Sequence, residues 1–367
     1  MTLSPAEGRI SRLRNRLDLE GLDAVVVTAA SNIQYLSGFT GSNGRMVVAP
    51  GAATLITDAR YSARASDELA ALRSEVGADV EVLIAPGAGE SALVQALEHA
   101  GVIGLEADHL SWSKAESLQA ALSPERVRST TGLVEGLREH KSNGELSLMR
   151  RAAAIADDAL AHVISGGVEG LSERRVQRAL DQRALELGAD GASFATIVAS
   201  GPNGARPHHE AGDRVLAAGD LVIIDFGAEV GGYRSDMTRS FVLGQPTAQQ
   251  EHMLDAVEAA QRAGVEAVAA GLATSEIDSV CRSVLADHDL AEYFVHGTGH
   301  GVGLDIHEAP SVSSTSTATL APGHVITVEP GVYIPNVGGV RWEDTVLVTP
   351  QGAEALTRSP KQPIIEL

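Results

Sequence analysis

The sequence predicts a mixed α/β (α+β) protein with a smaller N-terminal α/β unit and a larger C-terminal unit made of two similar halves. Two observations predict this fold class. Short apolar runs alternate with helical stretches in the first third of the chain, and the C-terminal part repeats one order of elements, two helices followed by strands. We expect one domain at residues 1–135, a polar connector at 136–144 and a second domain at 145–367.

The bulk composition is that of a globular chain, with 367 residues, 44% hydrophobic and 21% charged. Its formal charge is 28 − 48 = −20, which disfavours nucleic acid and anionic membranes as partners. The N-terminus has no apolar signal segment, and no stretch approaches about 18 apolar residues. We therefore expect a soluble, cytoplasmic protein. The single cysteine, Cys281, is expected to be a buried, inert thiol in a helix.

The first domain is predicted to contain a mixed sheet with helices. A helix over 5–20 carries Ile10, Leu13 and Leu17 at helical spacing. Strands are expected at 24–27, 46–48, 54–56, 80–83 and 102–105, and helices at 91–99 and 113–122.

In the second domain, Ser142 or Asn143 is expected to cap a helix over 145–165. The first half then continues with a helix that Ser172 caps and that ends near 187, and with strands at 193–200, 221–228 and 233–243. The second half is expected to have helices at 248–270 and 275–287, and strands near 292–296, 324–334 and 340–348. Residue identity between the halves is weak, so the pseudo-twofold repeat rests on element order.

In the first half, Asp225 interrupts a buried apolar strand, where a carboxylate is costly unless it is paired or bound to a metal. Asp236 follows a Gly231-Gly232 turn, and a hairpin there would bring both carboxylates to one face. Two structural alternatives stay open, namely a turn cap at Asp225 and an ion pair of Asp236 with Arg234 or Arg239.

The second half repeats this pattern, because Glu329 ends the apolar run that starts at Val325. Period two places Arg341 and Glu343 on one face of the last strand and Asp344 on the other, facing solvent or an outer shell of the site. A structural role is common for any one such acid. Four of them at apolar strands are hard to explain by surface solvation.

A glycine-rich loop carries three histidines, His296, His300 and His307, and glycine allows the backbone to approach a ligand closely. The loop lacks the nucleotide-binding patterns GK[ST] and GxGxxG, and it lacks the HExxH of ordinary zinc peptidases. Three histidines in one glycine-rich loop indicate a site. Ordinary polar roles are expected for His99, His109, His140, His162, His252, His288 and His324.

The combined set is an oxygen-rich cage with one imidazole: Asp225, Asp236, His300, Glu329 and Glu343. One divalent ion rarely needs four carboxylates and a histidine, whereas two ions about 3.5–4 Å apart use such a set. Carboxylate-rich ligation favours Mn²⁺, with Co²⁺ or Zn²⁺ as alternatives.

Residues 145 to about 350 resemble the pita-bread metallopeptidases, a family that includes methionine aminopeptidase, Xaa-Pro aminopeptidase (aminopeptidase P), Xaa-Pro dipeptidase (prolidase) and creatinase. The resemblance rests on the segments 225–227, 235–239, 296–303, 328–331 and 341–344, whose order and spacing agree throughout. Segments 32–44 and 57–61 resemble the creatinase-type N-terminal domain of small bacterial aminopeptidase P.

The resemblance implies a role for each site residue. Asp236 and Glu343 would bridge two metal ions, Asp225 would complete one site, and His300 with Glu329 would complete the other. Outside this ligand set, the resemblance implies the proton-handling loop histidine His208, the outer-shell histidine His307, the substrate-contacting His296 and the second-shell Arg341. Glu329 would also carry the proton to the leaving proline nitrogen.

The implied activity is hydrolysis of the N-terminal Xaa-Pro bond of short peptides with proline at position 2. Dipeptidases often carry an arginine after the His-Glu-x-Pro segment, and this chain has Ser311 there. We therefore expect an Xaa-Pro aminopeptidase, with Xaa-Pro dipeptidase as the alternative. A binding protein without activity and a metal-free creatinase-like amidinohydrolase are rivals that the complete ligand set disfavours. The family also implies a homodimer.

Overall fold

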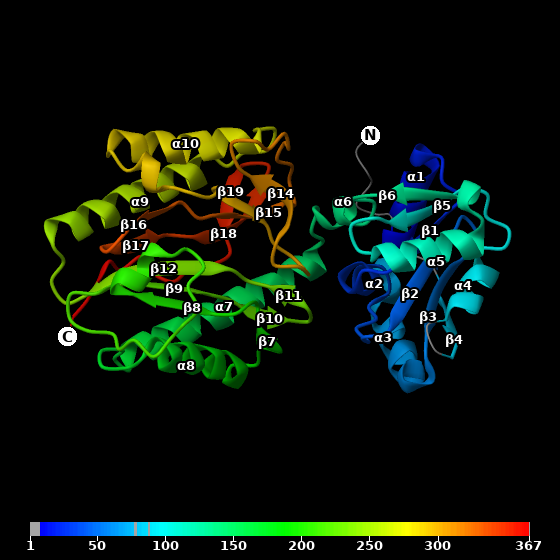
Figure 1. Ribbon diagram of the computed structural model, residues 1–367, viewed down its shortest axis with the longest axis horizontal. Helices are drawn as coiled ribbons and strands as arrows, with labels where there is room; N and C mark the ends of the chain where they lie inside the picture. The colour runs from blue at the N-terminus through cyan, green and yellow to red at the C-terminus, as the bar shows by residue number, and fades with distance from the viewer. Residues whose placement is uncertain (1–7, 77–78, 87–88, 367) are drawn as a thin grey trace. The chain divides into compact units, whose positions relative to one another are not determined.

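The computed structural model describes residues 8–76, 79–86 and 89–366. The chain separates into two compact units, Met1–Arg138 and Glu139–Leu367. Figure 1 shows both units, and each is described here by itself. Among the described residues, no helix is long and apolar enough to cross a membrane.

The first unit is built on a mixed sheet with the strand order β4-β3-β2-β1-β5-β6. Its strands are β1 (Ala24–Val27), β2 (Gly44–Val48), β3 (Ala53–Thr57), β4 (Glu81–Ile84), β5 (Ile103–Glu106) and β6 (Val127–Thr130). Its helices are α1 (Arg9–Glu20), α2 (Ala30–Ser37), η1 (Ala59–Tyr61), α3 (Ser62–Val76), α4 (Glu90–Ala96), α5 (Trp112–Leu122), η2 (Pro124–Arg126) and α6 (Glu135–Arg138).

Strand β1 lies at the centre of this sheet because all four of its residues are apolar and buried. It pairs antiparallel with β2 and parallel with β5, which confirms the mixed sheet that the sequence predicts. Helix α1 buries Ile10, Leu13 and Leu17, as their spacing predicts, and the expected residues 5–7 of this helix lie outside the described part.

The first half of the second unit has two long helices and a sheet with the order β20-β12-β9-β8, in which β8, β9 and β12 pair antiparallel and β20 pairs parallel with β12. Its elements are α7 (Asn143–Ser165), α8 (Glu173–Glu186), β7 (Gly191–Ala192), β8 (Ile197–Ser200), η3 (Gly201–Ala205), β9 (Leu221–Phe226), β10 (Ala228–Val230), β11 (Tyr233–Arg234), β12 (Met237–Leu243) and, from the C-terminal end, β20 (Ile364–Ile365). Ser142 caps α7 in a capping box with Glu145.

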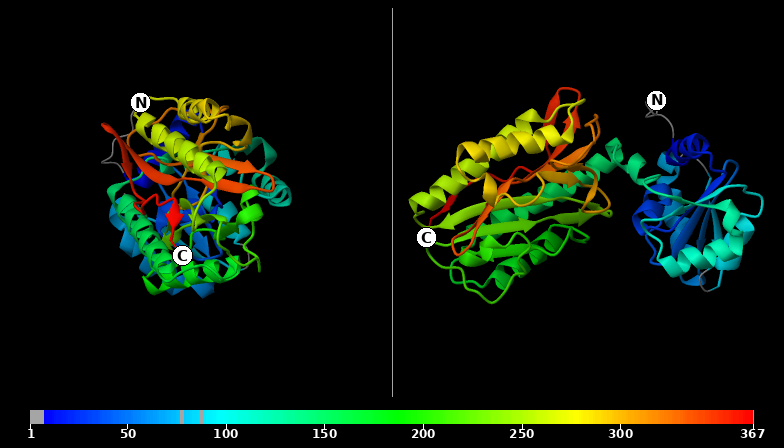
Figure 2. Two further views of the ribbon diagram at one scale, coloured as in Figure 1. Left: turned by 90° about the vertical axis from the view of Figure 1, so that its left-hand side faces the viewer. Right: turned by 45° about the horizontal axis from the view of Figure 1, so that its top comes forward.

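The second half repeats this plan with a sheet of order β14-β13-β15-β18-β19. Its elements are α9 (Ala248–Ala267), α10 (Thr274–Asp287), η4 (Ala291–Tyr293), β13 (Gly299–Gly301), β14 (Glu308–Val312), β15 (Val325–Val328), β16 (Gly331–Ile334), β17 (Gly338–Arg341), β18 (Asp344–Thr349) and β19 (Gly352–Ala355). In Figures 1 and 2 the yellow helices α9 and α10 cover the orange and red strands, and the green strands of the first half lie on the other side of those strands.

A pair of matching hydrogen bonds supports the pseudo-twofold relation. Thr196, just before β8, donates from Oγ1 to Asp181 of α8 over 2.6 Å. Thr298, just before β13, donates in the same way to Asp278 of α10 over 2.9 Å. In each half, therefore, an aspartate of the second helix accepts a hydrogen bond from the threonine that precedes a short strand of the sheet, β8 or β13.

Several expected strands differ from the structure, including the one over 340–348, which divides into β17 and β18 with Trp342 and Glu343 between them. The strand near 292–296 is wrong, because η4 occupies the first residues, Phe294 is buried against the guanidinium of Arg282, and Val295 is exposed. The strand over 233–243 divides into β11 and β12, and Asp236 lies between them. The strand over 324–334 divides at Glu329 and Pro330, since proline has no N–H for the ladder.

Candidate metal centre

The four predicted carboxylates lie at corresponding places in the two halves. Asp225 is in β9, and Asp236 directly precedes the neighbouring strand β12. Glu329 directly follows β15, and Glu343 directly precedes the neighbouring strand β18. The antiparallel pairing of β9 with β12 and of β15 with β18 brings each pair of acids to one end of its sheet.

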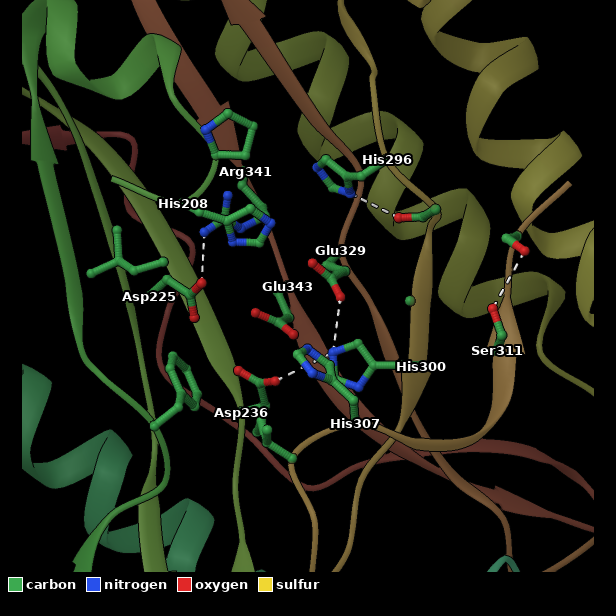
Figure 3. Close-up of a pocket in the computed structure, with 17 residues that line it drawn as sticks. His208, Asp225, Asp236, His296, His300, His307, Ser311, Glu329, Arg341 and Glu343 are labelled. Carbon is green, nitrogen blue, oxygen red and sulfur yellow. Dashed lines mark hydrogen bonds and ion pairs between the residues drawn. The ribbon is translucent and has the colours of Figure 1, made fainter. Parts of the chain in front are cut away.

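All nine residues that the sequence singles out line one cavity of ≈ 350 Å³: His208, Asp225, Asp236, His296, His300, His307, Glu329, Arg341 and Glu343. Figure 3 shows their side chains converging from several strands and loops. Apolar walls come from Phe194, Ile197, Pro207 and Ile306. The seven histidines that were given ordinary roles lie elsewhere.

His300 presents a nitrogen lone pair to two acids. Its Nδ1 lies 3.0 Å from the carbonyl oxygen of Gly301, and a carbonyl only accepts, so Nδ1 carries the proton. Its Nε2 lies 3.2 Å from Oε1 of Glu329 and 3.6 Å from Oδ2 of Asp236. A neutral ring of this tautomer would turn a lone pair toward two carboxylates, which is favourable only with a cation or a proton between them.

The acids also repel one another. Burial, followed by the charges of Glu343, Asp225 and Glu329, raises the pKa of Asp236 well above its ordinary value. Burial and the charges of Glu329 and Asp225 likewise raise the pKa of Glu343. Burial would also raise the pKa of Glu329, but a protonated His300, present while no cation lies between them, outweighs burial and lowers this pKa to about 2. Glu329 in turn raises the pKa of His300 against burial. If all four acids were ionised, the cluster would carry more negative charge than its own side chains neutralise.

Unsatisfied oxygens indicate where a cation fits. Oδ1 of Asp225 and Oε1 of Glu343 are buried without a hydrogen-bond partner, although each side chain uses its other oxygen. One ligand atom from each of Asp236, His300 and Glu343 lies within 4.8 Å of the other two. Buried oxygens without donors, beside an imidazole lone pair, fit a divalent cation.

Arg341 belongs to a hydrogen-bonded chain at one side of the cavity. Its Nη2 donates to Asp225 over 2.6 Å, and its Nη1 donates to the hydroxyl of Tyr333 over 2.7 Å. That hydroxyl lies 2.8 Å from Nε2 of His296, whose Nδ1 donates to the carbonyl of Gly297 over 2.8 Å. Both ring nitrogens of His296 are therefore engaged within the protein.

Tyr333 was not found by sequence reasoning. It lies in β16, and its hydroxyl joins His296 to Arg341. Burial raises the pKa of Tyr333 to about 12, so the hydroxyl keeps its proton. A polar ring in the apolar run 331–334 is the only sequence signal for it, and such a ring is common in ordinary cores.

The alternative of a plain ion pair at Asp236 fails. Arg234 pairs with Glu229 over 3.0 Å, and Arg239 pairs with Asp344 over 2.8 Å. Asp344 does not face solvent, because it is buried and also accepts from Gln261 and Lys361. Asp344 does not line the cavity, and its place in an outer shell of the site stays a prediction.

His208 and His307 reach the cavity from exposed loops. The ring of His307 lies 4.3 Å from that of His300, at a steep angle of 80°. Burial and the neighbouring His300 lower the pKa of His307, which favours its neutral form. A neutral imidazole has one N–H to donate into the cavity.

Comparison with known families gives two matches along the chain. Metallopeptidase family M24 matches residues 147–350, and the Creatinase/Prolidase N-terminal domain matches residues 9–140.

Similar proteins cover almost the whole chain. An Xaa-Pro dipeptidase of Pyrococcus furiosus is 33% identical over 96% of this chain and 99% of its own length. The solved Xaa-Pro dipeptidase from Bacillus anthracis has a TM-score of 0.92 and 38% identity, and covers 98% of this chain and 99% of that one. The X-Pro aminopeptidase from Thermotoga maritima has a TM-score of 0.87 and 31% identity, and covers 98% of this chain and 100% of that one.

Proposed function

This chain belongs to metallopeptidase family M24, with the pita-bread fold and a creatinase-type N-terminal domain, and we propose that it hydrolyses Xaa-Pro dipeptides. The sequence favoured aminopeptidase action on longer peptides. Relatives named Xaa-Pro dipeptidase, which match over 96% and 98% of the chain, support the alternative better.

One observation supports the proposal most. Four carboxylates and the free lone pair of His300 converge in a cavity of ≈ 350 Å³, a size suited to a small ligand. Family M24 implies divalent metal ions. We propose two ions, of Mn²⁺ in the first place, held by Asp225, Asp236, His300, Glu329 and Glu343. Divalent ions in such a site polarise a carbonyl group and make a water molecule more acidic.

The other residues of the cavity have separate tasks in the proposed reaction. His208 and His307 would donate hydrogen bonds to the carbonyl oxygen as negative charge develops on it, a contribution of roughly 3–4 kcal/mol per donor. Glu329 would accept a proton at its carboxylate and pass it to the leaving proline nitrogen. Oγ1 of Thr327 donates to Oε1 of Glu329 over 3.0 Å and so orients that carboxylate.

Proline at position 2 suits the walls of this cavity. The Xaa-Pro bond is a tertiary amide without an N–H, so a binding site needs no acceptor for it. Phe194, Ile197 and Ile306 offer apolar surface to a pyrrolidine ring. Arg341 is bound to Asp225 and Tyr333, and would act by holding Asp225 in place.

A second candidate is Xaa-Pro aminopeptidase action on longer peptides, which Ser311 favours. Ser311 lines the cavity where an arginine could pair with a dipeptide carboxylate. Among the described residues of the cavity wall, Arg341 is the only arginine or lysine, and each of its three nitrogens already donates within the protein, to Thr238, Tyr333 and Asp225.

Three substrates tested in parallel separate the candidates: Ala-Pro, Ala-Pro-Ala and Ala-Ala-Ala, each with the Mn²⁺-loaded protein. Dipeptidase action predicts fastest hydrolysis of Ala-Pro, and aminopeptidase action predicts fastest hydrolysis of Ala-Pro-Ala. Equal rates with Ala-Ala-Ala would contradict proline specificity, and no hydrolysis of any of them would contradict the proposed function.

Glu329→Gln tests the role of the carboxylate. It should lose most turnover while its far-ultraviolet circular dichroism stays that of the parent. Glu354→Gln, an exposed site in β19, is the matched control and should keep full activity. A homodimer stays a prediction, which light scattering after gel filtration checks.

A further inference from the structure

A buried carboxylate outside the cavity binds the loop that carries His208. Glu173, the first residue of α8, is 0% exposed. Its Oε1 accepts from the backbone N of Ser200 over 2.9 Å, from Oγ of Ser200 over 2.7 Å and from Nδ2 of Asn203 over 3.0 Å. Its Oε2 accepts from the backbone N of Gly212 over 3.1 Å and lies 2.8 Å from Nε2 of His209.

These contacts fix both ends and the middle of residues 200–212, here called the His208 loop. Beyond η3 this loop contains no regular helix or strand among its described residues. His208 and Pro207 line the cavity, whereas the next residue, His209, faces Glu173. The backbone N of Glu173 also donates to the carbonyl of Arg214 just beyond the loop, over 2.9 Å.

The chemistry of this anchor requires an ionised carboxylate. Burial would raise the pKa of Glu173, but hydrogen bonds from Asn203, His209 and Ser200 outweigh it, and the pKa lies below its ordinary value. Every partner of the two oxygens is a donor, since Nε2 of His209 must also donate to a carboxylate. A glutamine here would point an NH₂ group at donors, and unpaired buried polar groups are costly.

One turn further along α8, side chains on the same face as Glu173 form hydrogen bonds next to the wall of the cavity. Gln177 and Asp181 follow Glu173 at intervals of four residues, so the three side chains share one face. Nε2 of Gln177 donates to the carbonyl of Thr196 over 3.1 Å, and Asp181 accepts from Oγ1 of Thr196. Thr196 directly precedes Ile197, which lines the cavity.

We propose that Glu173 is a positioning residue, which holds the His208 loop so that His208 faces the cavity while His209 serves as an anchor. The inference rests on the proposed function, since it assigns Glu173 an effect on turnover through His208. Glu173 itself does not line the cavity, so it acts without touching the substrate.

A double-mutant cycle tests this dependence. Glu173→Gln should lower kcat for the Xaa-Pro substrate by roughly 10- to 100-fold, the effect of a small misplacement of a catalytic group, with little change in KM. In a His208→Ala background, the same substitution should have no further effect. Glu186→Gln is the matched control, because it makes the same change on the same helix at an exposed site, and it should leave kcat unchanged.

Equal losses from Glu173→Gln with and without His208 would overturn the proposal, as would a kcat equal to that of the Glu186→Gln control. If Glu173→Gln is not recovered folded, His209→Ala, which removes one donor to Glu173, takes its place in the double-mutant cycle with His208→Ala. The same two results would support or overturn the proposal.

Hydrogen exchange gives a readout that does not depend on activity. In the full chain, with and without Mn²⁺, peptides that span residues 200–212 should exchange faster in Glu173→Gln than in the parent or in Glu186→Gln. Peptides from α10 should not change. Unchanged exchange at 200–212 would overturn the positioning role. A parent protein that cleaves no Xaa-Pro substrate but shows faster loop exchange in Glu173→Gln would refute only the proposed function.

Discussion

Arg341 donates from Nη2 to Oδ2 of Asp225 over 2.6 Å, and this ion pair links β17 of the second half to β9 of the first. The side chains are 4% and 14% exposed. Arg341 also donates to Thr238 and Tyr333, so one guanidinium holds groups from both halves. The pair occupies one oxygen of Asp225 and leaves Oδ1 without a partner.

Arg341→Met should destabilise the protein strongly, because it leaves the carboxylate of Asp225 buried without its counter-charge. We expect a loss of about 3–5 kcal/mol in the free energy of unfolding, measured in urea with a chelator present. Arg150→Met is the control, since Arg150 forms an exposed pair with Glu354 over 2.9 Å and should cost about 1 kcal/mol or less. Similar losses in the free energy of unfolding of both variants would contradict a larger contribution of the buried pair to stability.

Asp236→Asn should separate the stability of the metal-free protein from metal binding. Without metal, the variant should be at least as stable as the parent, because one of several mutually repelling acids becomes neutral. Added Mn²⁺ should stabilise the folded parent by about 2.7 kcal/mol when its concentration is one hundred times Kd, and the Tm of the parent should rise accordingly. The Tm of the variant should rise much less.

Calorimetric melting with and without Mn²⁺ measures both effects. Asp213→Asn is the control, since Asp213 is 83% exposed in a surface pair with Arg174, and its response to Mn²⁺ should equal that of the parent. An undiminished Mn²⁺ response in Asp236→Asn would exclude this carboxylate as a ligand.

His324 should make the stability of the protein depend on pH between about 6.5 and 4. Burial, with the nearby His140 and Lys141, lowers its pKa from 6.5 to about 4. The unfolded chain therefore binds a proton that the folded chain excludes, and stability falls as pH drops through this range, by at most roughly 3 kcal/mol.

Urea unfolding of the parent and of His324→Gln at pH 8, 6 and 5 checks the sign. The variant lacks this titration, so its free energy of unfolding, taken relative to that of the parent, should rise as pH falls. His162→Gln, at an exposed site in α7, should follow the parent at every pH. A constant difference between His324→Gln and the parent would contradict the shifted pKa.

Cys281 should resist alkylation in the folded protein. The thiol is 0% exposed in α10, and burial raises its pKa to about 12, so almost no thiolate forms at pH 8. Iodoacetamide should label it slowly in buffer and fully in urea, as mass spectrometry detects. Rapid labelling of the folded protein would require a local opening around α10.

Much of the fold follows from local sequence pattern. The apolar run at residues 24–27 is a central buried strand, and Ser142 with Glu145 forms the expected helix start. The strand near 292–296 was wrong because Phe294 is buried in the hydrophobic core of the second half, with the guanidinium of Arg282 over its ring, and not by strand pairing. The local hydrophobic pattern indicates that a residue is buried, but it does not indicate which neighbouring residues bury it.

The sequence by itself determined which residue types could form a metal centre, because carboxylates at apolar strands are costly without a counter-charge. Only the tertiary structure decided which partners these residues have. Arg341 pairs with Asp225, which lies 116 residues away in the sequence, and the hydroxyl of Tyr333 joins Arg341 to His296. Glu173 holds the His208 loop through contacts such as the one with His209. The physical reason is that hydrogen bonds depend on distances of about 3 Å between atoms, and chain folding sets these distances between segments whose separation in sequence carries no periodic signal.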